Sequence, residues 1–71
     1  MMLTQLKPGE IARIVAIGGG HGLRQKLYLR GICEGNVIRT ISCRGPITVE
    51  VDRNVVSIGR GMAQKVRVIR V

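Results

Sequence analysis

Residues 22–36 constrain the fold more than any other stretch, because they form the only long segment with a helical pattern. Leu23 and Leu27 lie one helical turn apart and can face the same core. Gly31 stands where a helix can end in left-handed backbone at little cost, and Ile32 can then fold back onto the helix, as in a Schellman motif. The segment therefore predicts one short helix that ends at Gly31.

The rest of the chain has the pattern of short strands joined by tight turns. β-Branched residues and glycines are frequent, and apolar and polar residues alternate most cleanly over residues 47–51. We expect strands over residues 10–17, 37–43, 47–51, 55–58 and 65–71, a loop over residues 18–22, and one helical turn over residues 59–63. The predicted turns and helix end are set by six residues, namely Gly9, Gly31, Gly35, Gly45, Pro46 and Gly59.

These elements predict a single mainly β domain over residues 1–71. Five short strands in an open sheet would leave exposed edges, and closing them into a small, bent barrel removes most of that exposure. The expected fold is a barrel of about five strands, with one short α-helix between strands one and two covering one opening. A chain of 71 residues buries only about 60% of its extended surface, so we expect one modest core.

The chain is strongly basic, with 12 Lys and Arg against 4 Asp and Glu, which gives a net charge of +8. Such a charge predicts attraction to nucleic acid or to an acidic protein face. The basic residues are scattered along the chain, however, which favours the simpler interpretation that they keep an aliphatic-rich domain soluble. Without a signal peptide pattern or an apolar run long enough to span a membrane, we expect a cytoplasmic protein with no membrane insertion and with reduced cysteines.

Catalytic patterns are absent from the sequence. No two carboxylates are spaced as an obvious acid–base pair, and no third group is suggested that would orient a Cys–His nucleophile. The run Gly18-Gly19-Gly20-His21-Gly22 lacks the spacing of a P-loop or a dinucleotide fingerprint, although it precedes a helix. We interpret it as a flexible connection, and we expect neither enzymatic activity nor a required cofactor.

His21 and Cys33 are the candidate ligands for a weak Fe²⁺ or Zn²⁺ site. Cys43 is the only other side chain of this ligand class. None of these residues has the Cys-x-x-Cys type of spacing that marks structural zinc sites. A metal site would therefore require that the fold bring distant residues together.

The outward side of the predicted helix has the composition of a protein contact. If Leu23 and Leu27 face inward, an exposed aromatic and an exposed aliphatic residue lie between two arginines, a combination common in interfaces. The candidate contact residues are Arg24, Tyr28, Leu29 and Arg30. In the alternative, the helix rotates to bury Leu29 and leaves only Tyr28 partly exposed.

A series of glycine, proline and apolar positions resembles the FeoA family over nearly the whole chain. The matching segments are Leu6-x-Pro8-Gly9-Glu10, Leu27-x-x-x-Gly31-Ile32-x-x-Gly35, Gly45-Pro46-x-x-Val49, Ile58-Gly59-x-x-Met62-Ala63 and Val66-x-Val68. The resemblance implies an SH3-like barrel, a module that also occurs at the C-terminus of DtxR-type metal-dependent repressors. Arg30 departs from the family, in which this position is usually apolar. The family has no fixed catalytic motif, so no active site is implied.

The resemblance implies a small cytoplasmic accessory protein of ferrous iron transport that binds the cytosolic part of the FeoB transporter and modulates it. Two alternatives remain. One is a basic small barrel that binds nucleic acid, which the near absence of aromatic residues for base stacking disfavours. The other is a stand-alone interaction domain of a metal-dependent regulator.

Overall fold

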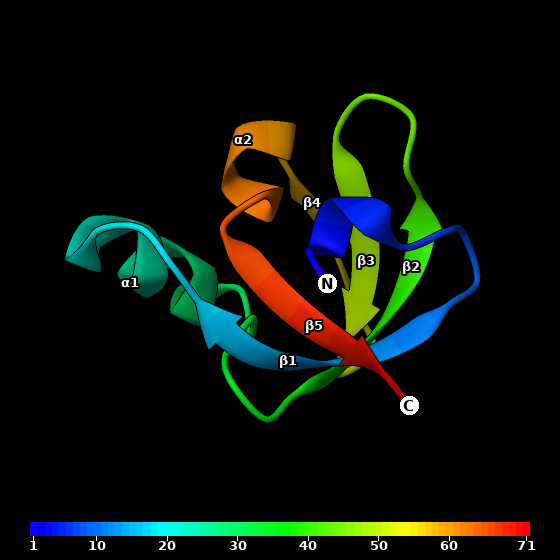
Figure 1. Cartoon of the computed structure of the whole chain (residues 1–71), viewed down its shortest axis with the longest axis horizontal. Helices are drawn as coiled ribbons and strands as arrows, with labels where there is room; N and C mark the ends of the chain where they lie inside the picture. Colours follow the sequence, from blue (N-terminus) through cyan, green and yellow to red (C-terminus); the bar gives the residue numbers. More distant parts are fainter.

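Five antiparallel strands form one sheet in the order β4-β3-β2-β1-β5 in the computed structural model, which describes residues 1–71 (Figure 1). The strands are β1 (Ile11–Ile17), β2 (Val37–Ser42), β3 (Ile47–Val51), β4 (Asn54–Ile58) and β5 (Val66–Arg70). The other elements are the 3-10 turn η1 (Leu3–Gln5), helix α1 (His21–Leu29) and the helical turn α2 (Arg60–Ala63). The predicted mainly β fold, with one helix between the first two strands, is confirmed.

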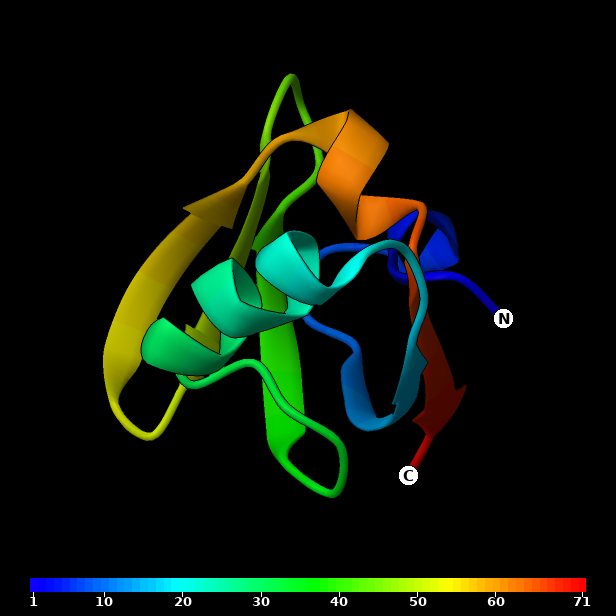
Figure 2. The ribbon, with the colours of Figure 1, turned by 90° about the vertical axis from the view of Figure 1, so that its left-hand side faces the viewer.

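The sheet is strongly curved, and α1 lies across its open side. Figure 2 shows α1 with β4 on one side and β1 and β5 on the other. Neither helix is long and apolar enough to cross a membrane.

The core fills the inside of this curved sheet with aliphatic side chains, and Thr40 is the one buried polar residue. Successive side chains of a strand point to opposite faces of the sheet, so every second residue of β3 faces the core. Ile47, Val49 and Val51 are at most 2% exposed. Thr48 and Glu50, which lie between them, are half-buried. Leu27 is the one buried residue of α1, and Leu23 packs against the core from a partly buried position. The helix is therefore joined to the barrel mainly through Leu27.

The helix end has the geometry that the sequence predicted. Gly31 has φ +84°, its N–H donates to the Tyr28 carbonyl at 3.0 Å, and the N–H of Ile32 donates to the Leu27 carbonyl at 2.9 Å. This pair of bonds defines a Schellman motif. Ile32 is fully buried, so the chain turns back towards the barrel immediately after α1.

The remaining predicted turn residues lie between elements. Gly9, Gly35 and Gly45 have positive φ, Pro46 directly precedes β3, and Gly59 has φ −60° as the N-cap of α2. The strand expected over residues 55–58 begins one residue earlier, because Asn54 already pairs with Val51 and belongs to β4. The expected loop over residues 18–22 is shorter, because His21 and Gly22 form the first turn of α1.

Candidate protein-binding site

The outward side of α1 carries two exposed hydrophobic residues next to each other. Tyr28 is 45% exposed and Leu29 is 85% exposed, whereas Leu27 is fully buried. The helix is thus not rotated to bury Leu29. An aliphatic side chain this exposed contributes little to the core, and together with Tyr28 it leaves apolar surface available for contact.

A groove of about 450 Å³ runs between the C-terminal end of α1 and the β3–β4 hairpin. It is lined by Tyr28, Leu29, Arg30, Gly31, Val51, Asp52, Asn54 and Val56. Three of the four predicted contact residues therefore line one concave surface, and the hairpin supplies the other wall. The lining is mixed, because each wall contributes both aliphatic and polar or charged residues.

Arg30 bridges the two walls of this groove. Its Nη1 donates a hydrogen bond to the carbonyl oxygen of Ser57 at 3.2 Å. That carbonyl belongs to β4, an outermost strand of the sheet, so Arg30 occupies one of the backbone acceptors at this edge. The other outer strand, β5, is covered in part by the N-terminus, because the N–H of Val68 donates to the Met1 carbonyl at 2.8 Å.

Arg24, the fourth predicted contact residue, lines a different hollow. This smaller space of about 260 Å³ is bordered by His21, Arg24, Gln25 and Tyr28. Tyr28 therefore lies between the two hollows. The Arg24 Nε donates to the carbonyl of Ile17 at 3.2 Å, which ties α1 to the end of β1.

Glu34 joins α1 to the segment that follows it. The Tyr28 hydroxyl donates to Glu34 Oε1 at 3.0 Å, and Arg24 Nη2 lies 3.8 Å from Glu34 Oε2. Both contacts cross the reversal at Gly31 and place residues 33–36 beside the helix. Arg24 and Tyr28 thus orient the site as well as forming part of its surface.

The Tyr28–Glu34 contact shifts both titrations. A hydrogen bond from the backbone N–H of Glu34 lowers the pKa of its carboxyl below the usual 4.5, and the Tyr28 hydroxyl and the nearby Arg24 charge lower it further. The hydrogen bond that the Tyr28 hydroxyl donates to the Glu34 carboxylate raises the pKa of Tyr28 above 10.0. A lowered carboxyl pKa stabilises the folded state above pH 4.5, and this contribution is lost as the pH falls through the folded-state pKa.

We expect Glu34→Gln to make the free energy of unfolding less sensitive to acid. As the pH falls below 4.5, the unaltered chain should lose stability more steeply than the variant, because only the unaltered chain must protonate Glu34. Glu10, whose pKa is lowered first by a hydrogen bond from the Lys7 N–H and then by Arg70, should keep some pH dependence in both proteins. Urea unfolding at several pH values measures this, and identical pH dependence in both proteins would refute the assigned role of Glu34.

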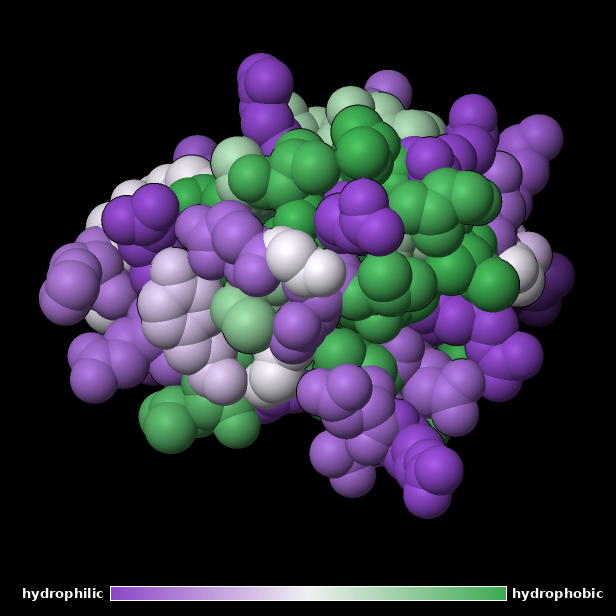
Figure 3. Space-filling view, turned by 90° about the horizontal axis from the view of Figure 1, so that it is seen from below, coloured by the Kyte–Doolittle hydropathy of each residue, from purple (hydrophilic) through white to green (hydrophobic).

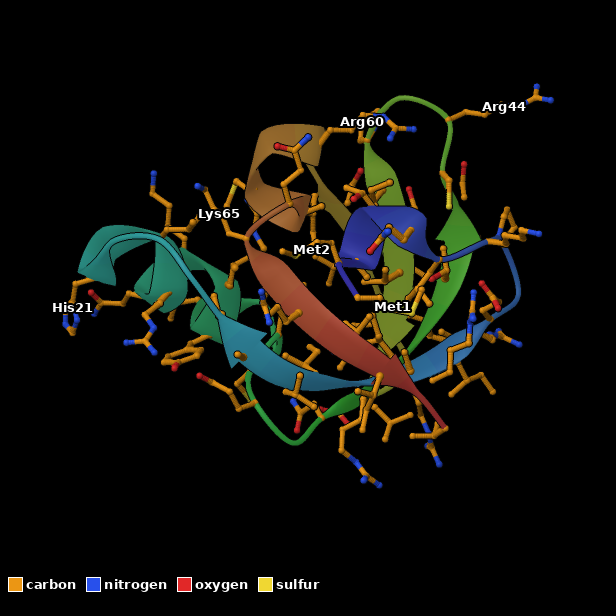
Figure 4. All side chains as sticks on the ribbon, viewed as in Figure 1. Met1, Met2, His21, Arg44, Arg60 and Lys65 are labelled. Atoms are coloured by element: carbon orange, nitrogen blue, oxygen red, sulfur yellow. The ribbon has the colours of Figure 1, made fainter.

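The two candidate metal ligands are not brought together. His21 begins α1 and points away from the barrel (Figure 4), whereas Cys33 follows the reversal of the chain at Gly31, beyond the other end of the helix. The Cys33 sulfur instead receives a hydrogen bond from Asn36 Nδ2 at 3.1 Å. No group of three or more His, Cys, Asp or Glu side chains is placed to hold one metal ion.

The sequence did not indicate Glu34 or the hairpin wall as parts of this site. The signal for Glu34 was present, because a Schellman reversal at Gly31 returns the following residues to the side of the helix. No comparable signal existed for Val51, Asp52, Asn54 and Val56, which reach the groove only through the curvature of the sheet.

Comparison with known proteins gives a consistent family and fold. The profile of the FeoA domain matches residues 1–70. An iron uptake regulatory protein, FeoA, is 35% identical, with a TM-score of 0.94 over 100% of this chain and 96% of that one. The FeoA protein of Chlorobium tepidum is 22% identical, with a TM-score of 0.92, and the match covers 100% of this chain and 70% of that protein. No curated protein matches the chain.

The same fold also occurs within metal-dependent regulators. IdeR of T. acidophilum is 26% identical, with a TM-score of 0.95, and a manganese-dependent transcriptional repressor is 21% identical, with a TM-score of 0.92. All of this chain is covered in both matches, but only 34% and 41% of those longer proteins. The SH3-like barrel expected from the sequence is therefore confirmed.

Proposed function

Because the chain belongs to the FeoA family, which is linked to ferrous iron transport, we propose that it is an accessory protein that binds the cytosolic part of the FeoB transporter. Binding occurs at the groove between α1 and the β3–β4 hairpin and modulates ferrous iron uptake. The protein acts by contact and catalyses no reaction. The match to the FeoA family and the likeness to the FeoA iron uptake regulatory protein support this interpretation.

The observation that carries the proposal is Leu29, which is 85% exposed at the rim of a groove. A leucine exposed to this degree gains most from burial against a partner, at roughly 25 cal/mol for each Å² of apolar surface removed from water. Tyr28 and Arg30 beside it are of the residue types that dominate binding energy in protein interfaces. The groove therefore offers an apolar anchor beside polar groups that can fix its orientation.

Leu29→Asp is expected to weaken FeoB binding at least tenfold, because it places a charge where an apolar contact forms. The fold should persist, since Leu29 makes no contribution to the buried core. Binding is measured by biolayer interferometry on FeoB from the same source in lipid nanodiscs, and ferrous uptake by cells that carry each variant. Circular dichroism of each variant checks the fold.

Arg44→Gln is the matched control, because it also changes the net charge by −1. Arg44 lies in the β2–β3 loop and projects from the side of the molecule opposite to α1 (Figure 4). It should leave FeoB binding within about twofold of that of the unaltered chain. Equal losses for Leu29→Asp and Arg44→Gln would show that overall charge governs binding and would refute the groove as the binding site.

A stand-alone interaction domain of a metal-dependent regulator is the second candidate. Its support is the likeness to IdeR and to the manganese-dependent repressor, in which this fold forms part of a longer chain. Deleting the gene for this chain would then change transcription of metal-regulated genes before it changed ferrous iron uptake through FeoB. Measuring both responses in the same deletion strain distinguishes the two functions.

A further inference from the structure

The outer face of β2, β1 and β5 carries a group of half-exposed aliphatic side chains. Figure 3 shows apolar side chains gathered on this side of the molecule, with hydrophilic groups around and among them. The aliphatic members are Ile11, Val15, Val37 and Ile69, each between 44% and 48% exposed, and Val71, which is 63% exposed. Together with Arg13 we call these residues the Arg13 face. It is built on different strands from the α1 groove and does not include Leu29.

Strand register places Arg13 at the centre of this face. Arg13 lies opposite Val37 of β2 on one side and opposite Ile69 of β5 on the other. Residues directly opposite in antiparallel strands have Cβ atoms about 5 Å apart. Ile11 and Val15 flank Arg13 along β1 on the same side of the strand, Val15 at an irregularity in the β1–β5 register. Four aliphatic residues thus surround the position of Arg13 in the sheet.

The charge of Arg13 has no partner within the molecule. Arg39 and Arg70 on the adjoining strands are neutralised, since Arg39 pairs with Glu50 at 2.8 Å and Arg70 with Glu10 at 2.7 Å. The only other ion pair is between Arg24 and Glu34. Arg13 makes neither a side-chain hydrogen bond nor an ion pair. The face therefore presents the unpaired charge of Arg13 among aliphatic side chains, with the equally unpaired Arg67 next to Ile69 along β5. Arginine is one of the residue types that dominate binding energy in interfaces.

We propose that the Arg13 face docks a segment of a partner protein that presents a carboxylate among aliphatic side chains. The carboxylate pairs with Arg13, and the flanking aliphatic residues exclude water from that pair, which strengthens it. A second copy of this chain is a poor occupant, because each copy carries a net charge of +8. A lipid surface is also a poor occupant, because no member of the face is aromatic and none projects as a membrane anchor does.

The test uses two synthetic peptides of 14 residues, capped at both ends. One repeats Leu, Val and Ile around a central Glu, and the other has Gln in place of that Glu. Titration into the ¹⁵N-labelled chain, followed by two-dimensional NMR, should shift amide signals in β1, β2 and β5 with the Glu peptide. The Gln peptide should bind at least tenfold more weakly.

Arg13→Gln should weaken binding of the Glu peptide at least tenfold, whereas Arg44→Gln, with the same change of charge, should alter it less than twofold. Equal effects of the two variants, shifts spread over the whole surface, or absence of binding would each overturn the proposal. Cosedimentation of the chain with phosphatidylglycerol vesicles that is lost in Arg13→Gln would assign the face to lipid, and a dimer lost in Arg13→Gln would assign it to a second copy. Both results would also contradict the proposal.

Leu29→Asp separates this proposal from the proposed function. The variant should bind the Glu peptide with unchanged affinity, because Leu29 lies outside the Arg13 face. Loss of FeoB binding in Leu29→Asp with peptide binding intact supports two independent surfaces. Loss of peptide binding in Leu29→Asp would show that the peptide occupies the α1 groove and would overturn the assignment to the Arg13 face.

Discussion

Leu27→Ala is expected to lower the free energy of unfolding by about 2–5 kcal/mol, the usual cost of truncating a buried leucine. Leu27 is fully buried and is the only residue of α1 in the core. A domain of this length has a total stability of roughly 4–11 kcal/mol, so the loss is a large share of it. Urea unfolding followed by circular dichroism measures the change.

Leu29→Ala is the matched control for this prediction, because it removes the same atoms two residues further along. Leu29 is 85% exposed and makes no core contact, so its truncation should change the free energy of unfolding by less than about 0.5 kcal/mol. Comparable losses in both variants would mean that α1 is not joined to the barrel through Leu27.

Gly31→Ala is expected to cost about 1–2 kcal/mol, because an L-residue is strained in left-handed backbone. Gly31 has φ +84° at the end of α1. The added Cβ would lie 3.6 Å from Val51 Cγ1, an ordinary van der Waals contact, so backbone strain accounts for the expected loss. Because Gly31 and Val51 both line the α1 groove, the substitution should also disturb the proposed binding site.

Gly22→Ala makes the same substitution where no left-handed backbone is required. Gly22 lies within α1, and an added Cβ would have no heavy atom within 4 Å. The change should raise the free energy of unfolding by up to about 1 kcal/mol, since alanine favours helices over glycine. Changes of opposite sign in the free energy of unfolding at the two positions support the assigned helix end. An unchanged free energy of unfolding in Gly31→Ala would argue against it. Chemical denaturation of both variants decides between these results.

Local patterns in the sequence predicted most of the fold. Alternation in residues 47–51 and helical spacing in Leu23 and Leu27 each depend on side chains close in sequence, so they could be recognised without the structure. The end of the helix at Gly31 could be predicted for the same reason. The element boundaries moved by one or two residues, since the last residue of a strand or helix depends on its hydrogen-bonding neighbour.

The two candidate binding surfaces could be predicted only in part. Tyr28, Leu29 and Arg30 are consecutive, so a helical pattern suffices to propose that they lie together. The opposite wall of the groove comes from residues 51–56, and nothing in the sequence places that hairpin beside α1. Arg13 likewise looked like one of several scattered charges, and only the register against Val37 and Ile69 places it among aliphatic side chains of three strands.

The most direct test of the central claim is hydrogen–deuterium exchange of this chain with and without FeoB in lipid nanodiscs. Binding at the α1 groove predicts slower exchange at residues 28–31 and 52–57 and no change in the β2–β3 loop around Arg44. Unchanged exchange at both walls of the groove, in a sample where FeoB is shown to be bound, would contradict the claim that FeoB binds at this groove.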